Sequence, residues 1–188
     1  MTPLVSIIMG STSDMPVMEK AMKFLDEMQI PFEVNALSAH RTPAAVEKFA
    51  SEAAGRGIKV IIAGAGMAAA LPGVIAAQTT LPVIGVPIKG SVLDGVDALY
   101  SILQMPPGIP VATVAINGAL NAAILAMQMI ALGDEAMAKK FAEYKAGLGK
   151  KIEKANADLA EIKYKFKVYS SKLKEYGRAQ KDICNTCG

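Results

Sequence analysis

The chain of 188 residues contains one histidine, His40, within the segment Ser-Ala-His-Arg-Thr-Pro of residues 38–43. An imidazole changes charge between about pH 5 and 8 without a large environmental shift, so His40 is the leading candidate for proton transfer near neutral pH. A lone histidine is often only structural, but its neighbours favour a ligand site. Arg41, the next residue, carries a permanently charged planar guanidinium that suits phosphate.

A second candidate segment is Gly-Ser-Thr-Ser-Asp at residues 10–14, which follows an apolar run. Ser11, Ser13 and the backbone amides at the start of the next helix predict an anion site, because unpaired N–H groups and the helix dipole both favour phosphate. Asp14 has two interpretations that the sequence leaves open. In one its carboxylate accepts hydrogen bonds from ribose hydroxyls, and in the other it caps the helix.

The third segment, residues 64–70, reads Gly-Ala-Gly-Met-Ala-Ala-Ala and offers only backbone donors, backbone acceptors and a close, flat approach for a ring. It lacks the Gly-Lys-Ser/Thr of a Walker loop and the third glycine of a dinucleotide motif, so a nicotinamide cofactor is not expected. Neither a nucleophile–base pair nor a metal cluster is evident in the sequence. Together the three segments predict a phosphorylated sugar ligand with proton transfer on an attached ring.

Alternating strands and helices must position these segments. Short apolar runs predict strands at residues 4–9, 31–37, 60–63, 81–86 and 111–116, and helices are predicted to begin near Pro16, Pro43 and Leu71. Strands that are apolar on both faces indicate a parallel sheet covered on both sides. The predicted fold class is α/β, a three-layer αβα sandwich of flavodoxin-like or Rossmann-like type. Ligands collect at the carboxyl ends of such strands, where all three segments fall.

Two further helices are predicted beyond the sheet. Residues 120–132 are rich in Ala, Leu, Ile and Met all round, which indicates a helix that is buried or lies in a subunit interface. From Glu135 onward, apolar residues keep three-or-four spacing, which predicts a long amphipathic helix that packs against another subunit or folds back on its own chain. We expect an α/β catalytic domain at 1–133, this helix at 134–167 and a poorly ordered basic tail at 168–188.

Composition limits the function classes. With 52% hydrophobic and 20% charged residues, the chain has ample material for a packed core. The net charge of +3 comes from the tail, because residues 163–188 hold seven Lys/Arg against two acidic residues and the rest holds 13 basic against 15 acidic residues. The tail has no nucleic-acid-binding signature, so no nucleic acid partner is expected. Its Cys184 and Cys187 lack the context of a zinc site or a thioredoxin motif.

The sequence also predicts where the protein is located and whether it meets a membrane. The N-terminus lacks the basic region and the apolar run of a signal peptide, which predicts a cytoplasmic protein. The longest uncharged stretch, residues 60–88, is interrupted repeatedly by Gly and Pro, so we expect neither a membrane span nor a membrane partner.

Seven segments, two of them already described, follow one another along the chain and make the pattern specific. They are Gly-Ser-Thr-Ser-Asp (10–14), Ser-Ala-His-Arg-Thr-Pro (38–43), Leu-Pro-Gly (71–73), Pro-Val-Ile-Gly-Val-Pro (82–87), Gly-Val-Asp-Ala-Leu-Tyr-Ser (95–101), Gln-Met-Pro (104–106) and Gly-Ile-Pro-Val (108–111). With them the chain resembles the PurE family of de novo purine biosynthesis from about Val5 to Leu132. The segment at 38–43 and Gly-Ala-Gly at 64–66 are most similar to class I of that family.

The resemblance implies an isomerase, 5-(carboxyamino)imidazole ribonucleotide mutase, which moves a carboxylate from the exocyclic amine to ring carbon 4 without a metal, nucleotide or organic cofactor. It implies a homo-octamer with sites at subunit boundaries, a small-molecule ribonucleotide substrate, and His40 as the catalytic proton carrier. The predicted substrate-binding residues are Ser11, Ser13, Asp14, Ser38, Arg41, Gly64, Ala65, Gly66, Met67, Ala70 and Leu71.

Two positions depart from the family pattern. Class I members usually read Gly-Ala-Gly-Gly-Ala-Ala-His-Leu-Pro-Gly, and this chain has Met67 and Ala70 in place of the second glycine of the pair and the histidine. Methyl and thioether groups can still wall a carbon dioxide pocket, so we expect one active-site imidazole, His40. Two alternatives stay open: a direct aminoimidazole ribonucleotide carboxylase and a non-catalytic phosphosugar-binding module.

Overall fold

The computed structural model describes residues 2–163, which contain a five-stranded parallel sheet. The strands are β1 (Val5–Met9), β2 (Phe32–Ala36), β3 (Val60–Gly66), β4 (Val83–Ile88) and β5 (Ala112–Thr113), in the spatial order β2-β1-β3-β4-β5. This is the strand order of flavodoxin-like sheets, so the predicted fold class is confirmed. The direction of winding reverses between β1 and β3, and a crevice is expected at the carboxyl ends of these strands.

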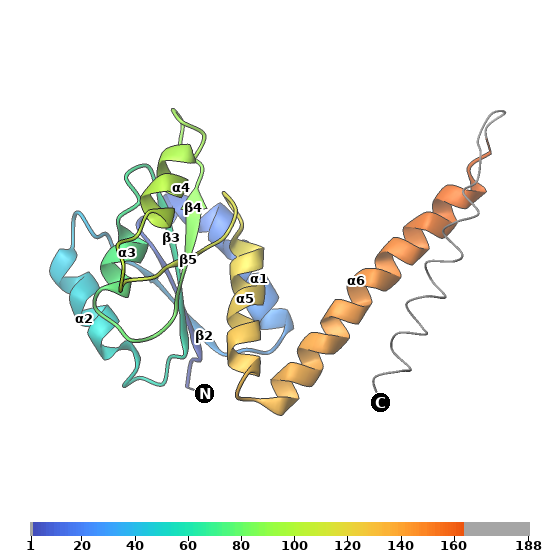
Figure 1. Ribbon diagram of the computed structural model, residues 1–188, viewed down its shortest axis with the longest axis horizontal. Coiled ribbons are helices and arrows are strands. Elements are labelled where there is room, and N and C mark those ends of the chain that lie inside the picture. The colour runs from blue at the N-terminus through green and yellow to red at the C-terminus, as the bar shows by residue number, and fades with distance from the viewer. Residues whose placement is uncertain (1, 164–188) are drawn as a thin grey trace. The chain divides into compact units, whose positions relative to one another are not determined.

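Helices cover both faces of the sheet. They are α1 (Met15–Glu27), α2 (Pro43–Ala53), α3 (Leu71–Ala76), α4 (Val96–Leu103) and α5 (Ala119–Ala131), with a 3₁₀ turn, η1 (Thr12–Asp14), before α1. Figure 1 shows α1 and α5 on one side of the sheet and α2 and α3 on the other. Residues of α4 join those of α2 and α3 in one buried apolar cluster. The three layers predicted from the sequence are therefore present.

The apolar pattern explains these elements. Every residue of β1 and β4 is buried, as expected of strands packed on both faces. In α1 the predicted stripe buries Met18, Ala21, Phe24 and Leu25. In α2 the buried residues include Val46, Phe49 and Ala50. Small side chains of α5 are buried where this helix packs against α1. The helices thus fix the strand ends from which the candidate segments emerge.

Three elements differ from the sequence prediction. Strand β4 continues two residues beyond Val86 to Ile88, and β5 comprises only Ala112 and Thr113. The sequence pattern did not predict α4 at all. Its buried residues, Ala98 and Ile102, face the core, but Tyr100 and other apolar side chains face outward.

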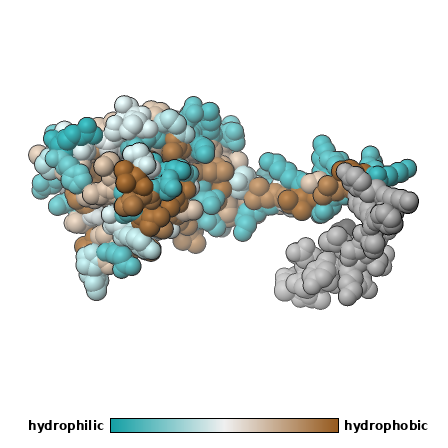
Figure 2. Space-filling model, turned by 90° about the horizontal axis from the view of Figure 1, so that it is seen from above, coloured by the Kyte–Doolittle hydropathy of each residue, from teal (hydrophilic) through white to brown (hydrophobic). Residues whose placement is uncertain are grey.

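The final described helix, α6 (Glu135–Glu161), confirms the predicted long C-terminal helix. The chain divides into two compact units, Met1–Ala142 and Glu143–Gly188, and the first turns of α6 belong to the first unit. There Lys140 donates hydrogen bonds to the Met28 carbonyl and, at 3.1 Å, to Gln29 Oε1. No residue of α6 is buried, and the helix keeps apolar side chains on its surface (Figure 2).

The packing of α6 against another subunit stays a prediction. The predicted basic tail at 168–188, with Cys184 and Cys187, lies outside the described residues. Among residues 2–163, no helix combines the length and the apolar character needed to cross a membrane.

Candidate active site

A cavity of about 500 Å³ lies at the carboxyl ends of β1, β2, β3 and β4. Residues that follow each of these strands line it, in the position that the strand order predicts. The lining residues are Gly10, Ser11, Ser13, Asp14, Ser38, Ala39, His40, Arg41, Ala65, Gly66, Met67, Ala68, Ala69, Ala70, Leu71, Ile88, Lys89 and Gly90. The cavity therefore brings together every predicted site residue except Gly64. The roles of these residues in catalysis and binding stay predictions.

The segment after β1 forms one polar wall of the cavity. Ser11 Oγ accepts a hydrogen bond from the backbone N–H of Ser13 at 3.3 Å and so caps η1. Asp14 begins α1, but its side chain makes no capping hydrogen bond. Its Oδ1 instead accepts a hydrogen bond from Ser13 Oγ at 3.5 Å. The Asp14 side chain therefore caps no backbone N–H of α1, and its carboxylate lines the cavity.

Burial sets the protonation behaviour of Asp14. Partial removal from water raises the pKa of its carboxyl above the ordinary value, because burial disfavours the charged form. Hydrogen bonds from the backbone of Ser11, the side chain of Ser13 and the backbone of Gly10 oppose this shift without cancelling it. A ligand that donates hydrogen bonds to this carboxylate would replace the lost solvation.

The segment after β2 presents His40 and Arg41 from a braced turn. The Thr42 side-chain hydroxyl donates to the Ser38 carbonyl and accepts from the Ser38 N–H, each at 3.0 Å. Arg41 Nη2 donates to the Gly10 carbonyl at 2.8 Å, and its Nε donates to Ser38 Oγ at 3.2 Å. The guanidinium thus ties the segment after β2 to the segment after β1, which positions the two polar walls relative to each other.

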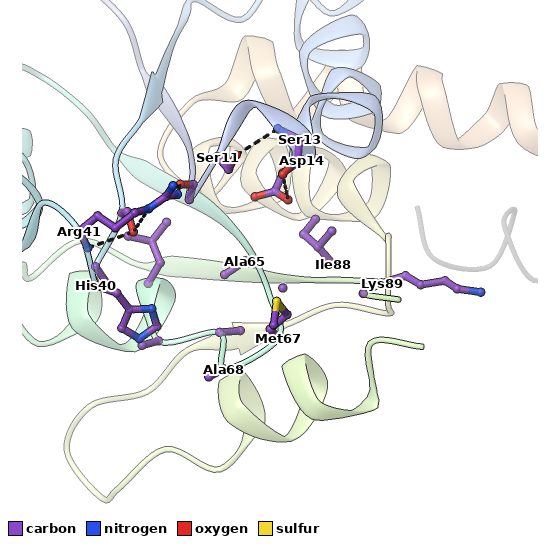
Figure 3. A pocket seen from close by; sticks show the side chains of 18 residues that line it. Ser11, Ser13, Asp14, His40, Arg41, Ala65, Met67, Ala68, Ile88 and Lys89 are labelled. Carbon is purple, nitrogen blue, oxygen red and sulfur yellow. Dashed lines mark hydrogen bonds between the residues drawn. The ribbon is translucent and has the colours of Figure 1, made fainter. Parts of the chain in front are cut away.

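His40 lies at the exposed tip of this turn. Within the described residues its imidazole has no hydrogen-bond partner, so both ring nitrogens face the cavity or solvent without an internal competitor. Figure 3 shows the His40 imidazole and the Asp14 carboxylate on opposite sides of the cavity, with Ala65 between them in this view. The arrangement places one imidazole, one carboxylate and one guanidinium around the same cavity.

The segment after β3 forms an apolar wall. Ala65, Ala68, Ala69 and Ala70 contribute only methyl groups, and Leu71 begins α3. Met67 has a φ of 56°, a left-handed conformation that is unfavourable for a side chain other than glycine. This explains in physical terms why the family pattern has glycine here. Met67 lines the cavity and is 69% exposed.

Gly64, predicted to bind substrate, lies inside β3 and does not line the cavity. A Cβ at this position would lie 2.6 Å from Met18 Sδ, below any ordinary contact distance. The glycine is therefore required for packing of α1 against the sheet, and the predicted contact of Gly64 with the ligand stays a prediction.

Sequence reasoning missed the segment after β4, where Ile88, Lys89 and Gly90 also line the cavity. Lys89 Nζ forms an ion pair with Asp94 Oδ1 at 2.8 Å, and its side chain points away from the centre of the cavity (Figure 3). The signal that could have found this segment is the one used for the other three loops. Polar and glycine residues follow an apolar run at Lys89-Gly90-Ser91, at the end of a strand.

Comparison with known proteins places the chain among curated relatives. It is 56% identical over 162 residues to the phosphoribosylaminoimidazole carboxylase of Candida glabrata, an alignment that covers 86% of this chain but 28% of the relative. It is 52% identical over 160 residues to the N5-carboxyaminoimidazole ribonucleotide mutase of Pyrococcus horikoshii, covering 85% of this chain and 90% of the relative. The chain thus spans about a quarter of the fungal proteins and nearly all of the archaeal one.

Solved structures and family models agree with these relatives. The crystal structure of Treponema denticola PurE matches with a TM-score of 0.76 at 33% identity, covering 84% of this chain and 98% of that structure. The model of the AIRC family, described as AIR carboxylase, matches residues 4–151. The chain therefore belongs to the AIR carboxylase family.

Proposed function

We propose that the protein is an isomerase that converts 5-(carboxyamino)imidazole ribonucleotide to 4-carboxy-5-aminoimidazole ribonucleotide. The observation that carries the proposal is the composition of the cavity at the carboxyl ends of the strands. A serine, aspartate and arginine rim suits a phosphorylated ribose, one imidazole serves proton transfer, and an apolar wall faces them. Two relatives named as mutases, from Pyrococcus horikoshii and Thermotoga maritima, match this chain along 90% and 95% of their length, which favours a mutase over a carboxylase.

In the proposed reaction the N–C bond of the carboxyamino group breaks first. The electron pair stays on nitrogen, which takes a proton from His40, and carbon dioxide is released into the cavity. Carbon 4 of the imidazole then attacks the carbon dioxide to form the new C–C bond, and the proton on carbon 4 passes to His40. The proton given in the first step is thereby recovered, so the overall change is an isomerisation with no net proton uptake.

The polar walls would hold the ribonucleotide during this sequence. We assign Ser11, Ser13, Ser38 and Arg41 to the phosphate side, because these residues supply hydroxyls and a guanidinium around the N-terminal side of η1 and α1. We assign the Asp14 carboxylate to the ribose hydroxyls. Its raised pKa fits a carboxyl that awaits donors from a ligand.

The same proposal includes a cytoplasmic homo-oligomer, an octamer by family resemblance. Exposed apolar side chains outside the cavity support self-association, for example Leu132 at 91% exposure and Val92 at 86%. Light scattering at micromolar concentration tests it, and a monomer with full activity would contradict it.

One assay tests the function against its nearest alternative, which the names of the fungal relatives favour. The purified full chain is offered 5-(carboxyamino)imidazole ribonucleotide in one reaction and aminoimidazole ribonucleotide with bicarbonate in another, and product is followed by ultraviolet absorbance. We expect turnover of the carboxyamino compound at low bicarbonate. Turnover with bicarbonate alone would indicate the direct carboxylase, and ligand binding without turnover in either reaction would indicate a phosphosugar-binding module.

A further inference from the structure

Met67 is the most exposed methionine among the described residues. Its exposed fraction is 69%, and Met15, at 38%, is the other exposed methionine of this part of the chain. Met9, Met18 and Met127 have exposed fractions of 1% or less. A methionine thioether is oxidised most readily where solvent reaches its sulfur, so exposure ranks these side chains by their expected rate of oxidation. Met67 stands first in that order.

The local backbone holds Met67 at the surface. Its φ of 56° is left-handed, and its carbonyl accepts a hydrogen bond from the Ala69 N–H at 2.9 Å, which closes a tight turn directly after β3. The Ala68 carbonyl accepts from the Ala70 N–H at 2.7 Å. A left-handed residue other than glycine costs free energy and persists where the surrounding structure requires it. The turn thus keeps the Met67 thioether where solvent reaches it.

The Met67 side chain belongs to the apolar wall of the cavity. Ala65, Ala68, Ala70 and Ile88 line the cavity with it, and none of the four has a side chain that donates a hydrogen bond. In the view of Figure 3 the Met67 sulfur points toward Ala65 and Ile88. Oxidation would place a polar sulfoxide oxygen on this wall. That oxygen would bind water in the cavity, and a ligand that displaced the water would leave it without a partner.

We propose that Met67 is a site of reversible oxidation that weakens ligand binding in the cavity. The inference rests on the proposed function, since the ligand affected is a ribonucleotide. The thioether sulfur attacks one oxygen of hydrogen peroxide, so that an S–O bond forms and the O–O bond breaks. Sulfur loses two electrons and the peroxide gains them. The departing hydroxide takes the proton of the transferred hydroxyl and leaves as water. Two thiols reverse the change and yield the thioether, one water and one disulfide.

The residue type makes this response particular to this chain. The family pattern has glycine at position 67, and glycine offers no side chain to oxidise in this turn. Met67 itself forms and breaks no bond with the ligand. Its presence therefore adds sensitivity to peroxide at the edge of the cavity without a part in the proposed reaction.

The first measurement locates the oxidation. The full chain is treated with a graded series of hydrogen peroxide concentrations, and its peptides are examined by mass spectrometry for the gain of one oxygen atom. We expect Met67 to be oxidised before Met15, and both before Met9 and Met18. Saturating aminoimidazole ribonucleotide should slow the oxidation of Met67 and leave that of Met15 unchanged, because Met15 does not line the cavity. Oxidation of Met67 no faster than that of the buried methionines would overturn the proposal.

The second measurement links the oxidation to binding. After peroxide treatment, the Kd for aminoimidazole ribonucleotide should rise about tenfold, the order expected when a buried polar group is left unpaired. Met67→Gln places a polar group in the wall permanently and should show a raised Kd without peroxide. Met67→Leu has no sulfur, so its Kd should be the same before and after treatment. Met15→Leu is the matched control and should respond to peroxide as the wild type does.

A repair step separates methionine from cysteine chemistry. Dithiothreitol alone reduces disulfides and sulfenic acids, including any that Cys184 and Cys187 form, but it leaves methionine sulfoxide unchanged. It should therefore fail to restore the Kd. Dithiothreitol with the two methionine sulfoxide reductases, one for each sulfoxide epimer, should restore it. Recovery with dithiothreitol alone would assign the effect to the cysteines and overturn the role of Met67.

Two further outcomes would overturn the proposal. One is an unchanged Kd when Met67 is fully oxidised, and the other is an equal loss of affinity in Met67→Leu after treatment. Failure of the proposed function looks different. An untreated wild type that binds aminoimidazole ribonucleotide but converts no carboxyamino compound would contradict the mutase activity alone, and the comparison of Kd values would still decide whether oxidation of Met67 controls binding.

Discussion

The two sides of the cavity differ in how they are built. On the β1 and β2 side, polar side chains hold one another through hydrogen bonds such as Arg41 to Gly10, and their hydroxyls, carboxylate and guanidinium face the cavity. On the β3 and β4 side, methyl groups and one thioether form the wall, and the precision comes from backbone conformation and close packing. The polar side suits recognition of an anionic ribonucleotide, and the apolar side suits an intermediate with no charge.

This difference implies that substitutions on the two sides fail in different ways. Changes on the polar side should alter ligand affinity or proton transfer while the fold is retained, because these side chains lie at the surface of the sheet edge. Changes at the glycines of β3 should alter stability, because their neighbours are buried side chains.

The largest expected effect is at His40. Because it is the single histidine of the chain, His40→Asn removes the proposed proton carrier without removing polarity at the tip of the turn. We expect kcat to fall about 10²- to 10⁴-fold, with the affinity for the ribonucleotide nearly unchanged. Steady-state kinetics and isothermal titration measure the two quantities. A variant that binds substrate and keeps wild-type turnover would refute the proposed mechanism.

Arg41→Lys gives the next largest effect. A lysine keeps the charge but cannot donate to the Gly10 carbonyl and to Ser38 Oγ with one planar group, so both the phosphate contact and the brace between the two segments weaken. We expect KM to rise about 10- to 100-fold with a smaller change in kcat. Lys48→Arg, on the exposed surface of α2, is the control for general effects of charge and size. An unchanged KM would place the phosphate elsewhere.

The strand-end rule explains how much of this site the sequence predicted. Apolar runs on a parallel sheet place the following residues at one edge, so Ser11, His40 and Met67 were predicted to meet although they are far apart in sequence. The fourth segment was missed because the run was taken to end before Pro87. The structure accommodates Pro87 in β4 because β5 pairs only with Ile84 and Gly85, which leaves no partner on that side that needs its missing N–H.

Properties that depend on three-dimensional neighbours were not predictable. The sequence could not distinguish Gly64, which packs against Met18, from Gly66, which lines the cavity, because both belong to one Gly-Ala-Gly segment. It also left two roles open for Asp14, since helix capping is decided by hydrogen-bond geometry rather than by residue type. Helix α4 was missed because it is short, with eight residues of which only Ala98 and Ile102 are buried, so it offers few positions to a search for helical spacing.

Gly64→Ala tests the packed side of the comparison. The new methyl group would approach Met18 Sδ at 2.6 Å, and Met18 is fully buried, so either the side chain or the strand must move. Overpacking of this kind costs about 1–3 kcal/mol of stability. Urea denaturation measures the loss. Gly133→Ala is the matched control, because a Cβ there meets nothing within 4 Å. Equal midpoints for the two variants would show that the contact with Met18 is relaxed at no cost.

Asp14→Asn gives the smallest effect and separates affinity from stability. The pKa of the Asp14 carboxyl is raised by burial, so the folded protein holds its proton more tightly than the unfolded chain does. Folding stability should therefore fall as the pH rises from the ordinary carboxyl pKa through the raised one, and the asparagine variant should lack this decrease.

At neutral pH the variant should be at least as stable as the wild type, yet its Kd for aminoimidazole ribonucleotide should rise about two- to tenfold, because a neutral amide is a weaker acceptor for ribose hydroxyls. Denaturation midpoints between acidic and neutral pH, with titration of the ligand, measure both quantities. If stability and affinity fell together, Asp14 would be holding η1 and α1 in place, and the polar side of the cavity would depend on packing in the same way as the apolar side.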